Sequence, residues 1–143
     1  MVYLIIIFLS LRLINLSIFP IFADEAIYIR WSQLAWQGNY FIPLSDGKTP
    51  LFMWVLSPLL QIINDPLIAG RLLSIISGLA TLIGVYLFTQ KLFNKKTALI
   101  ASTMVVLNPF LLFYDRLSLV DSLLTAIIVW VYYLSFNLFK KLT

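Results

Sequence analysis

Any catalysis by this chain has to use carboxylates, Lys, Arg, Ser, Thr or Tyr, because the sequence contains no histidine and no cysteine. Their absence excludes disulfides, Cys or His zinc sites, cysteine nucleophiles and acid–base chemistry by histidine. The search for a functional site therefore starts from the six acidic residues and the basic residues near them.

Two short polar segments contain most of these groups. The first, residues 22–28, has the adjacent acids Asp24 and Glu25. The second is residues 113–125, and its polar side chains are Asp115, Arg116, Ser118, Asp121, Ser122 and Thr125. Acids can take a proton from a hydroxyl, and cations can stabilise a departing phosphate. Together the two segments could form a site for a phosphate-bearing molecule.

Each acid also has a structural explanation that needs no chemistry. Asp24 suits a helix N-cap, and Glu25 would then suit the helix dipole in the first turn. Ser118 and Asp121 have the spacing of a capping box. Asp46-Gly47 suits a turn, and Asp65 before Pro66 suits an N-cap. Asp115 and Arg116 could pair or face water. Lys48 could be a solvated loop lysine.

The composition shows what kind of scaffold positions these groups. Of the 143 residues, 62% are hydrophobic and 11% are charged, against about 45–50% and about 25% in soluble domains. The net charge is +4, but the basic residues lie between apolar runs and form no polar face, so nucleic-acid binding is not indicated. The sequence predicts an all-α, multi-pass transmembrane helical bundle.

Four apolar runs are long enough to be spanning helices: residues 2–22, 66–89, 97–113 and 121–139. A fifth run, residues 50–63, is shorter, and we expect it to lie in the membrane interface. If it were instead a short span, the membrane orientation of every later helix would be inverted. The stretch 25–37 is expected to be an interfacial helix with Tyr28, Trp31 and Trp36. Small residues at Gly70, Ser74 and Gly78 predict close helix packing.

Charge placement predicts the orientation. Lys91, Lys95 and Lys96 follow the second span and Lys140 and Lys141 follow the fourth, with no acid nearby. The positive-inside rule then places these lysines and the N-terminus in the cytoplasm, and residues 23–65 and 114–120 outside.

Two features of the first span have alternative explanations. The first apolar run could be a cleaved signal peptide instead of a retained span. Arg12 interrupts this apolar run, which argues against a signal peptide. Arg12 itself would either find a polar partner on a neighbouring helix or contact a lipid phosphate.

Four motifs in series resemble the N-terminal part of the GT-C glycosyltransferases, most closely the protein mannosyltransferase and aminoarabinose transferase group. They are Asp24-Glu25-Ala26-x-Tyr28; Gly38-Asn39-Tyr40-Phe41-Ile42-Pro43 followed by Lys48-Thr49-Pro50-Leu51-Phe52-x-Trp54; Arg71-Leu72-Leu73-Ser74; and Arg116-x-x-x-x-Asp121-x-x-Leu124. Residues 1–143 would then be the N-terminal part of a longer enzyme, inactive alone.

The resemblance implies a polyprenyl-phosphate sugar donor and inverting transfer to an acceptor hydroxyl of a protein, lipid or glycan, on the extracytoplasmic face of the plasma (inner) membrane. It makes Asp24 the expected base, with Glu25 shaping the site and Asp121 orienting the acceptor or a cation. Lys48, Arg71, Arg116 and Tyr28 are the expected substrate and phosphate contacts. The resemblance implies no definite cofactor. A divalent cation at Asp24 and Asp121 stays open, although Gly47 stands where some members of the family have an acid that helps to hold a metal.

Two other functions also fit the sequence. The chain could be a non-catalytic membrane subunit or scaffold in which the acids are helix caps. It could also be a small lipid-handling transporter, with Arg12 and the outer polar rim lining a path through the bilayer.

Overall fold

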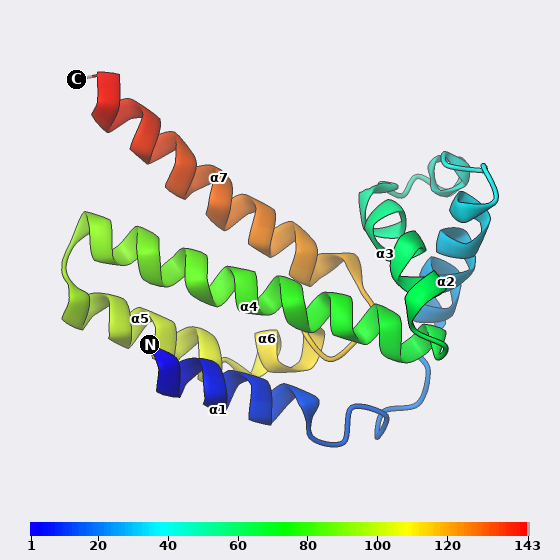
Figure 1. The fold of residues 1–143 in the computed structure, drawn as a ribbon, viewed down its shortest axis with the longest axis horizontal. Helices are drawn as coiled ribbons and strands as arrows, with labels where there is room; N and C mark the ends of the chain where they lie inside the picture. Colours follow the sequence, from blue (N-terminus) through cyan, green and yellow to red (C-terminus); the bar gives the residue numbers. More distant parts are fainter. Residues whose placement is uncertain (143) are drawn as a thin grey trace.

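A computed structural model describes residues 1–142 and shows an all-helical chain (Figure 1). Its elements are α1 (Val2–Leu13), α2 (Ala23–Trp36), the 3₁₀ helix η1 (Ile42–Asp46), α3 (Leu51–Ile62), α4 (Pro66–Leu92), α5 (Lys95–Leu107), α6 (Pro109–Tyr114) and α7 (Val120–Leu142). No strand occurs among the described residues, so the predicted all-α class is confirmed. Thr143 and the side chains of Lys141 and Leu142 lie outside the described part.

Helix α4 is the central element of the fold. It packs against α7 along one side and against α5 and α1 along the other (Figure 1). Its start was predicted correctly, since the Asp65 carboxylate accepts hydrogen bonds from the N–H groups of Leu67 and Ile68 and Pro66 occupies the first turn. Within residues 1–142, α4 and α7 are the helices long and apolar enough to cross a membrane.

The first and third predicted spans are shorter than expected. Helix α1 ends at Leu13, and the linker that follows has Asn15 at φ 52°. The third stretch is broken at Asn108, whose side chain accepts hydrogen bonds from the N–H groups of Phe110 and Leu111 and so starts a new helix, α6. Helices α1 and α5 contain 12 and 13 residues, or about 20 Å each, against a hydrocarbon core of about 30 Å.

Helices α2 and α3 lie across the end of α4 where that helix begins (Figure 1). Helix α3 has only 12 residues, as expected for an interfacial helix rather than a span. The turn predicted at Asp46-Gly47 is present, with Gly47 at φ 68°. Buried side chains hold α2, α3 and α4 together: Tyr28, Phe52, Met53, Leu56, Ala69 and Leu73.

The small residues of α4 make room for a segment that the sequence did not predict as their partner. The non-helical segment before α7 packs directly against them: a Cβ at Gly70 would overlap the Ser118 side chain, and one at Gly78 would come within 2.5 Å of the Asp115 carboxylate. Gly84, nearer the other end of α4, packs closely against a helix, since a Cβ there would meet Val129 of α7 at 2.7 Å. The close packing predicted at Gly70 and Gly78 is therefore present, but its nearest partner is the non-helical segment and not a helix.

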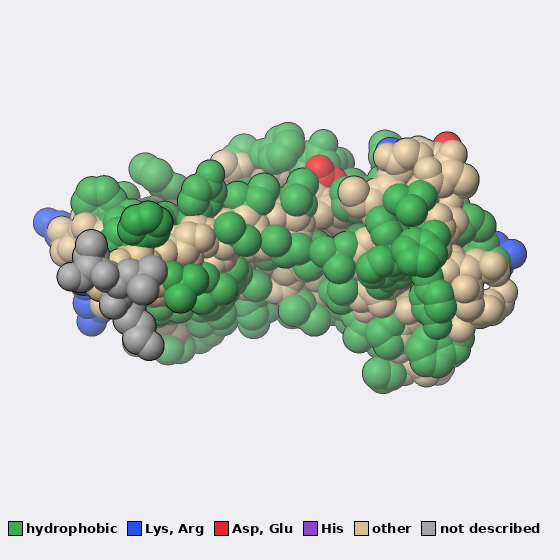
Figure 2. Space-filling model, turned by 90° about the horizontal axis from the view of Figure 1, so that it is seen from above, with side chains coloured by type: hydrophobic (Ala, Val, Ile, Leu, Met, Phe, Trp, Pro, Cys, Tyr) green, Lys and Arg blue, Asp and Glu red, His purple; other side chains and the backbone are tan. Residues whose placement is uncertain are grey.

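The surface suits a membrane environment. Figure 2 shows apolar side chains over most of one long face, with Lys and Arg toward the two ends of the molecule. The end of α4, the start of α5 and the end of α7 share one end, which gathers Lys91, Lys95, Lys96 and Lys140. The acids Asp24, Glu25 and Asp121 lie on elements nearer the opposite end, where α2 and α3 are found.

Candidate active site

One cavity of about 450 Å³ brings together residues from three distant parts of the chain. Four of the predicted site residues line it: Asp24, Tyr28, Lys48 and Asp121. Its other walls are Phe22, Phe113, Tyr114, Leu117, Leu119 and Val120. The cavity therefore combines two carboxylates and one ammonium group with a largely apolar wall.

The two acids of the cavity have no partners of their own. Asp24 is the second residue of α2, and Phe22 occupies the N-cap position, so the predicted capping role of Asp24 is wrong. Asp121 lies in the first turn of α7, and the predicted capping box is also absent because the Ser118 hydroxyl has no hydrogen-bond partner. Within residues 1–142, neither carboxylate accepts a hydrogen bond or joins an ion pair.

Lys48 supplies the positive charge of the cavity. It follows Gly47, whose left-handed backbone turns the chain back toward α3. Its Nζ atom lies 6.0 Å from the centroid of the Tyr28 ring, a ring that is buried against Trp31 and Phe52. No carboxylate of the described residues pairs with Lys48, so its charge is available to an anion in the cavity.

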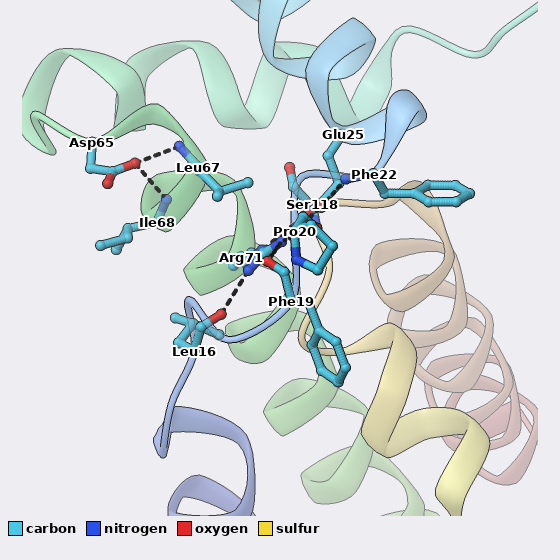
Figure 3. Close-up of polar contacts among 10 residues, drawn as sticks. All are labelled: Leu16, Phe19, Pro20, Phe22, Glu25, Asp65, Leu67, Ile68, Arg71 and Ser118. Atoms are coloured by element: carbon cyan, nitrogen blue, oxygen red, sulfur yellow. Dashed lines mark hydrogen bonds and ion pairs between the residues drawn. The ribbon is translucent and has the colours of Figure 1, made fainter.

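Glu25, next to Asp24, does not line the cavity and binds Arg71 of α4 (Figure 3). Both Glu25 oxygens take part, with Oε1–Nε and Oε2–Nη2 distances of 2.9 Å, and both side chains are fully buried. The backbone N–H groups of Phe22 and Ser118 also donate to Glu25, at 3.0 and 2.7 Å.

These contacts determine the ionisation of Glu25. Burial alone would raise the pKa of its carboxyl group, but the hydrogen bonds from Arg71, Phe22 and Ser118, together with the charge of Arg71, outweigh burial and lower the pKa. Glu25 is therefore held as a fully bonded carboxylate. It is suited to shaping the site, as expected from the sequence, and not to taking up a proton from substrate.

Arg71 holds the linker between α1 and α2. Besides Glu25, its guanidinium donates to the carbonyl oxygens of Leu16, Phe19 and Pro20, at 2.7, 3.2 and 3.3 Å (Figure 3). All three of its nitrogens are engaged and the side chain is fully buried. Arg71 does not line the cavity, so we assign it to positioning the linker in place of the phosphate contact expected from the sequence.

A second buried ion pair joins Arg12 to Asp115, with an Nε–Oδ2 distance of 2.7 Å. The Ser122 hydroxyl donates to the other carboxylate oxygen at 2.8 Å, and the guanidinium lies over the Phe8 ring. Arg12 thus has the polar partner that was one of its two expected explanations, and Asp115 pairs with it instead of with Arg116. The sequence signal for this pair was an intramembrane arginine that needed an acid.

Comparison with known families shows which family the chain belongs to. A family model described as dolichyl-phosphate-mannose-protein mannosyltransferase matches residues 47–142, well over half of the chain. The chain belongs to this family. The family confirms the predicted GT-C resemblance, and it implies a membrane glycosyltransferase that uses a lipid-linked sugar donor. Searches among curated proteins and among solved structures found no match.

The matched region of this mannosyltransferase-family chain includes Lys48, Arg71, Arg116 and Asp121, whereas Asp24 lies before it. The cavity is therefore built from both the matched region and the preceding helix α2. Among the described residues, no group of three or more His, Cys, Asp or Glu side chains could hold a metal ion. A cation at Asp24 and Asp121 stays a prediction.

Proposed function

We propose that the cavity is the reaction site of an inverting glycosyltransferase, which moves a sugar from a polyprenyl-phosphate carrier to an acceptor hydroxyl on the extracytoplasmic face. The observation that supports this most directly is the arrangement of Asp24, Lys48 and Asp121 around one cavity, each without a charged partner in the described chain. The start of α2 and the start of α7, which line the cavity, lie nearer the end of α4 opposite the lysine-rich end (Figure 1), and this supports a cytoplasmic position for the lysines in the plasma membrane.

In this mechanism, Asp24 is the general base. Its carboxylate takes the proton from the acceptor hydroxyl as that oxygen attacks the anomeric carbon of the sugar. The bond between the anomeric carbon and the phosphate oxygen breaks, and the polyprenyl phosphate leaves with the electron pair. A single displacement inverts the configuration at the anomeric carbon.

Lys48 stabilises the departing phosphate, because its ammonium group faces the same cavity and has no acid to neutralise it. A carboxylate is a weak base, so the rate depends on positioning and on stabilising the leaving group. Asp121, which lines the same cavity, orients the acceptor or a bound cation, and Tyr28 supports Lys48 through its ring.

An apolar groove beside the cavity fits the chain of a lipid-linked donor. It has a volume of about 130 Å³ and shares Val120 with the cavity. Its lining also includes Thr49, which follows Lys48 in the chain, and the others are Leu51, Phe52, Leu123, Leu124 and Ile127. A phosphate held at Lys48 would place the first part of the carrier in this groove, which continues along α7.

The two competing functions have less support. A scaffold was suggested because the acids could be helix caps, but Asp24 and Asp121 both lie inside a first turn and accept no capping hydrogen bond. A transporter was suggested with Arg12 and the outer polar rim lining a path, but the Arg12 side chain is fully buried and paired with Asp115.

The test is sugar transfer by the natural full-length protein in membranes, with the wild type compared with Asp24→Asn. We expect Asp24→Asn to lower the rate by about 10²–10⁴-fold, the usual contribution of a general base, while the protein still inserts in the membrane. Asp46→Asn is the matched control, since Asp46 is exposed at the end of η1 and lies outside the cavity. Transfer by Asp24→Asn at the wild-type rate would contradict the assignment.

A further inference from the structure

A second cavity, of about 420 Å³, lies beside the end of α1 and the linker that follows. Its polar lining consists of Ser10, Asn15 and Arg116, and its apolar lining includes Leu11, Ile14 and Ile18. It shares no lining residue with the cavity of Asp24 and Asp121. Arg116, expected from the sequence to contact the donor phosphate, therefore belongs to a different site.

Arg116 is the arginine of this region whose charge is uncompensated. Arg12 and Arg71 each have a carboxylate, but no acid of the described chain pairs with Arg116. Its Nη2 donates to the carbonyl oxygens of Ile14 and Asn15, at 2.9 and 2.8 Å. Its Nε is buried and has no hydrogen-bond partner in the described chain. A half-buried guanidinium whose charge no carboxylate of the described chain neutralises favours an anionic ligand.

An aromatic pair separates the two cavities. The ring of Phe19 stacks edge-on against Phe113, with 5.7 Å between the centroids. Phe19 lines the Arg116 cavity and Phe113 lines the Asp24 cavity. The Arg116 guanidinium lies 5.1 Å from the Phe19 centroid, and both residues line the second cavity and not the one at Asp24. A ligand at Arg116 would therefore not compete with the donor sugar.

The apolar lining indicates what the anion is attached to. Leu11, Ile14 and Ile18 are 39%, 62% and 64% exposed, so they form an apolar surface next to the guanidinium. A phospholipid fits both the polar and the apolar lining of the cavity. Its phosphate would contact Arg116 and Asn15, and its two fatty-acid chains would cover the three aliphatic side chains. We propose that this cavity binds an anionic phospholipid, independently of the glycosyl transfer proposed for the other cavity.

The experiment measures the unfolding temperature of the purified natural full-length protein in neutral detergent, with added phosphatidylglycerol, phosphatidylcholine or inorganic phosphate. Binding to the folded state raises this temperature in a concentration-dependent way. We expect phosphatidylglycerol to raise it for the wild type, and Arg116→Gln to need about tenfold more of the lipid, the usual effect of losing a charged hydrogen bond. Arg30→Gln is the control, because Arg30 is exposed and lies outside the cavity.

A second variant keeps the proposal testable if Arg116→Gln does not fold. Ile18→Trp would fill the apolar part of the cavity and should weaken the phosphatidylglycerol effect, whereas Ile21→Trp, equally exposed but outside the cavity, should not. Three results would overturn the proposal: no effect of phosphatidylglycerol on the wild type, equal effects on all variants, or an equal effect of phosphatidylcholine. A full effect of inorganic phosphate alone would also overturn it and identify a site for a soluble anion.

Discussion

Glu25 and Arg71, which are 46 residues apart in sequence, form a bidentate and fully buried ion pair. This pair connects the start of α2 to the first turns of α4. Glu25 is the neighbour of Asp24, the proposed base, so this pair determines where Asp24 lies. The same pair reaches the segment before α7 through the Ser118 N–H, and that segment leads to Asp121. The two free carboxylates of the cavity are thus held in place by contacts made outside it.

Removing the charge of Glu25 should destabilise the protein. In Glu25→Gln, the Arg71 guanidinium stays buried without a carboxylate, which typically costs about 3–5 kcal/mol. Denaturant unfolding of the natural full-length protein in detergent measures this loss, with the exposed Asp46→Asn as control. A free energy of unfolding within about 0.5 kcal/mol of the wild type, the usual range for surface changes, would show that the pair does not hold the linker.

The same carboxylate should make stability depend on pH. Because the folded state lowers the pKa of Glu25, the unfolded chain binds its proton more readily, and stability rises with pH in the acidic range. The contribution of Glu25 to stability is complete above its pKa in the unfolded chain, about 4.3. It is lost as the pH falls through the lower pKa of the folded state. Unfolding temperatures between neutral and acidic pH should fall less steeply for Glu25→Gln, and parallel curves for the two proteins would contradict this.

A methyl group at position 78 should disturb the second ion pair. The Cβ of Gly78→Ala would come within 2.5 Å of the Asp115 carboxylate, which binds Arg12 and Ser122. We expect a loss of about 1–3 kcal/mol, as for other overpacked sites. Thermal unfolding checks the change against Ile76→Ala, a control on the exposed face of the same helix. If the two variants unfolded alike, the close contact between α4 and Asp115 would not hold.

Replacing Lys48 should lower the rate of sugar transfer and leave the stability of the fold unchanged. Its ammonium group has no acid partner in the described chain, so Lys48→Gln leaves no buried charge behind. Because the cation is expected to stabilise the leaving phosphate, transfer should fall by about 10²–10³-fold, with partial recovery in Lys48→Arg. Lys95→Gln, at the opposite end of the molecule, serves as the control. Equal loss in both glutamine variants would remove Lys48 from the mechanism.

Local patterns in the sequence were enough to predict some of these features. The long spans α4 and α7, the Asp65 cap and the gathering of Asp24, Lys48 and Asp121 followed from hydropathy, capping chemistry and a motif series. The end of α1 at Leu13 did not, because the linker that follows is also apolar. Its backbone carbonyls are satisfied by Arg71 and Arg116, more than 50 residues away.

The sequence also did not indicate which residues the buried charges pair with. Arg12 and Asp115 are 103 residues apart, and Gly78 admits Asp115 only because a non-helical segment, not a helix, packs there. Spacing along one helix contains no information on such contacts. They depend on how three segments meet around α4.

The most direct test of the central claim separates donor binding from transfer in a single turnover. The natural full-length protein would be loaded with a radiolabelled polyprenyl-phosphate sugar, and binding and transfer would be measured for the wild type and Asp24→Asn. The proposed mechanism predicts that Asp24→Asn binds the donor with unchanged affinity and transfers the sugar at least about 10²-fold more slowly. Transfer at the wild-type rate by the donor-loaded variant would contradict it.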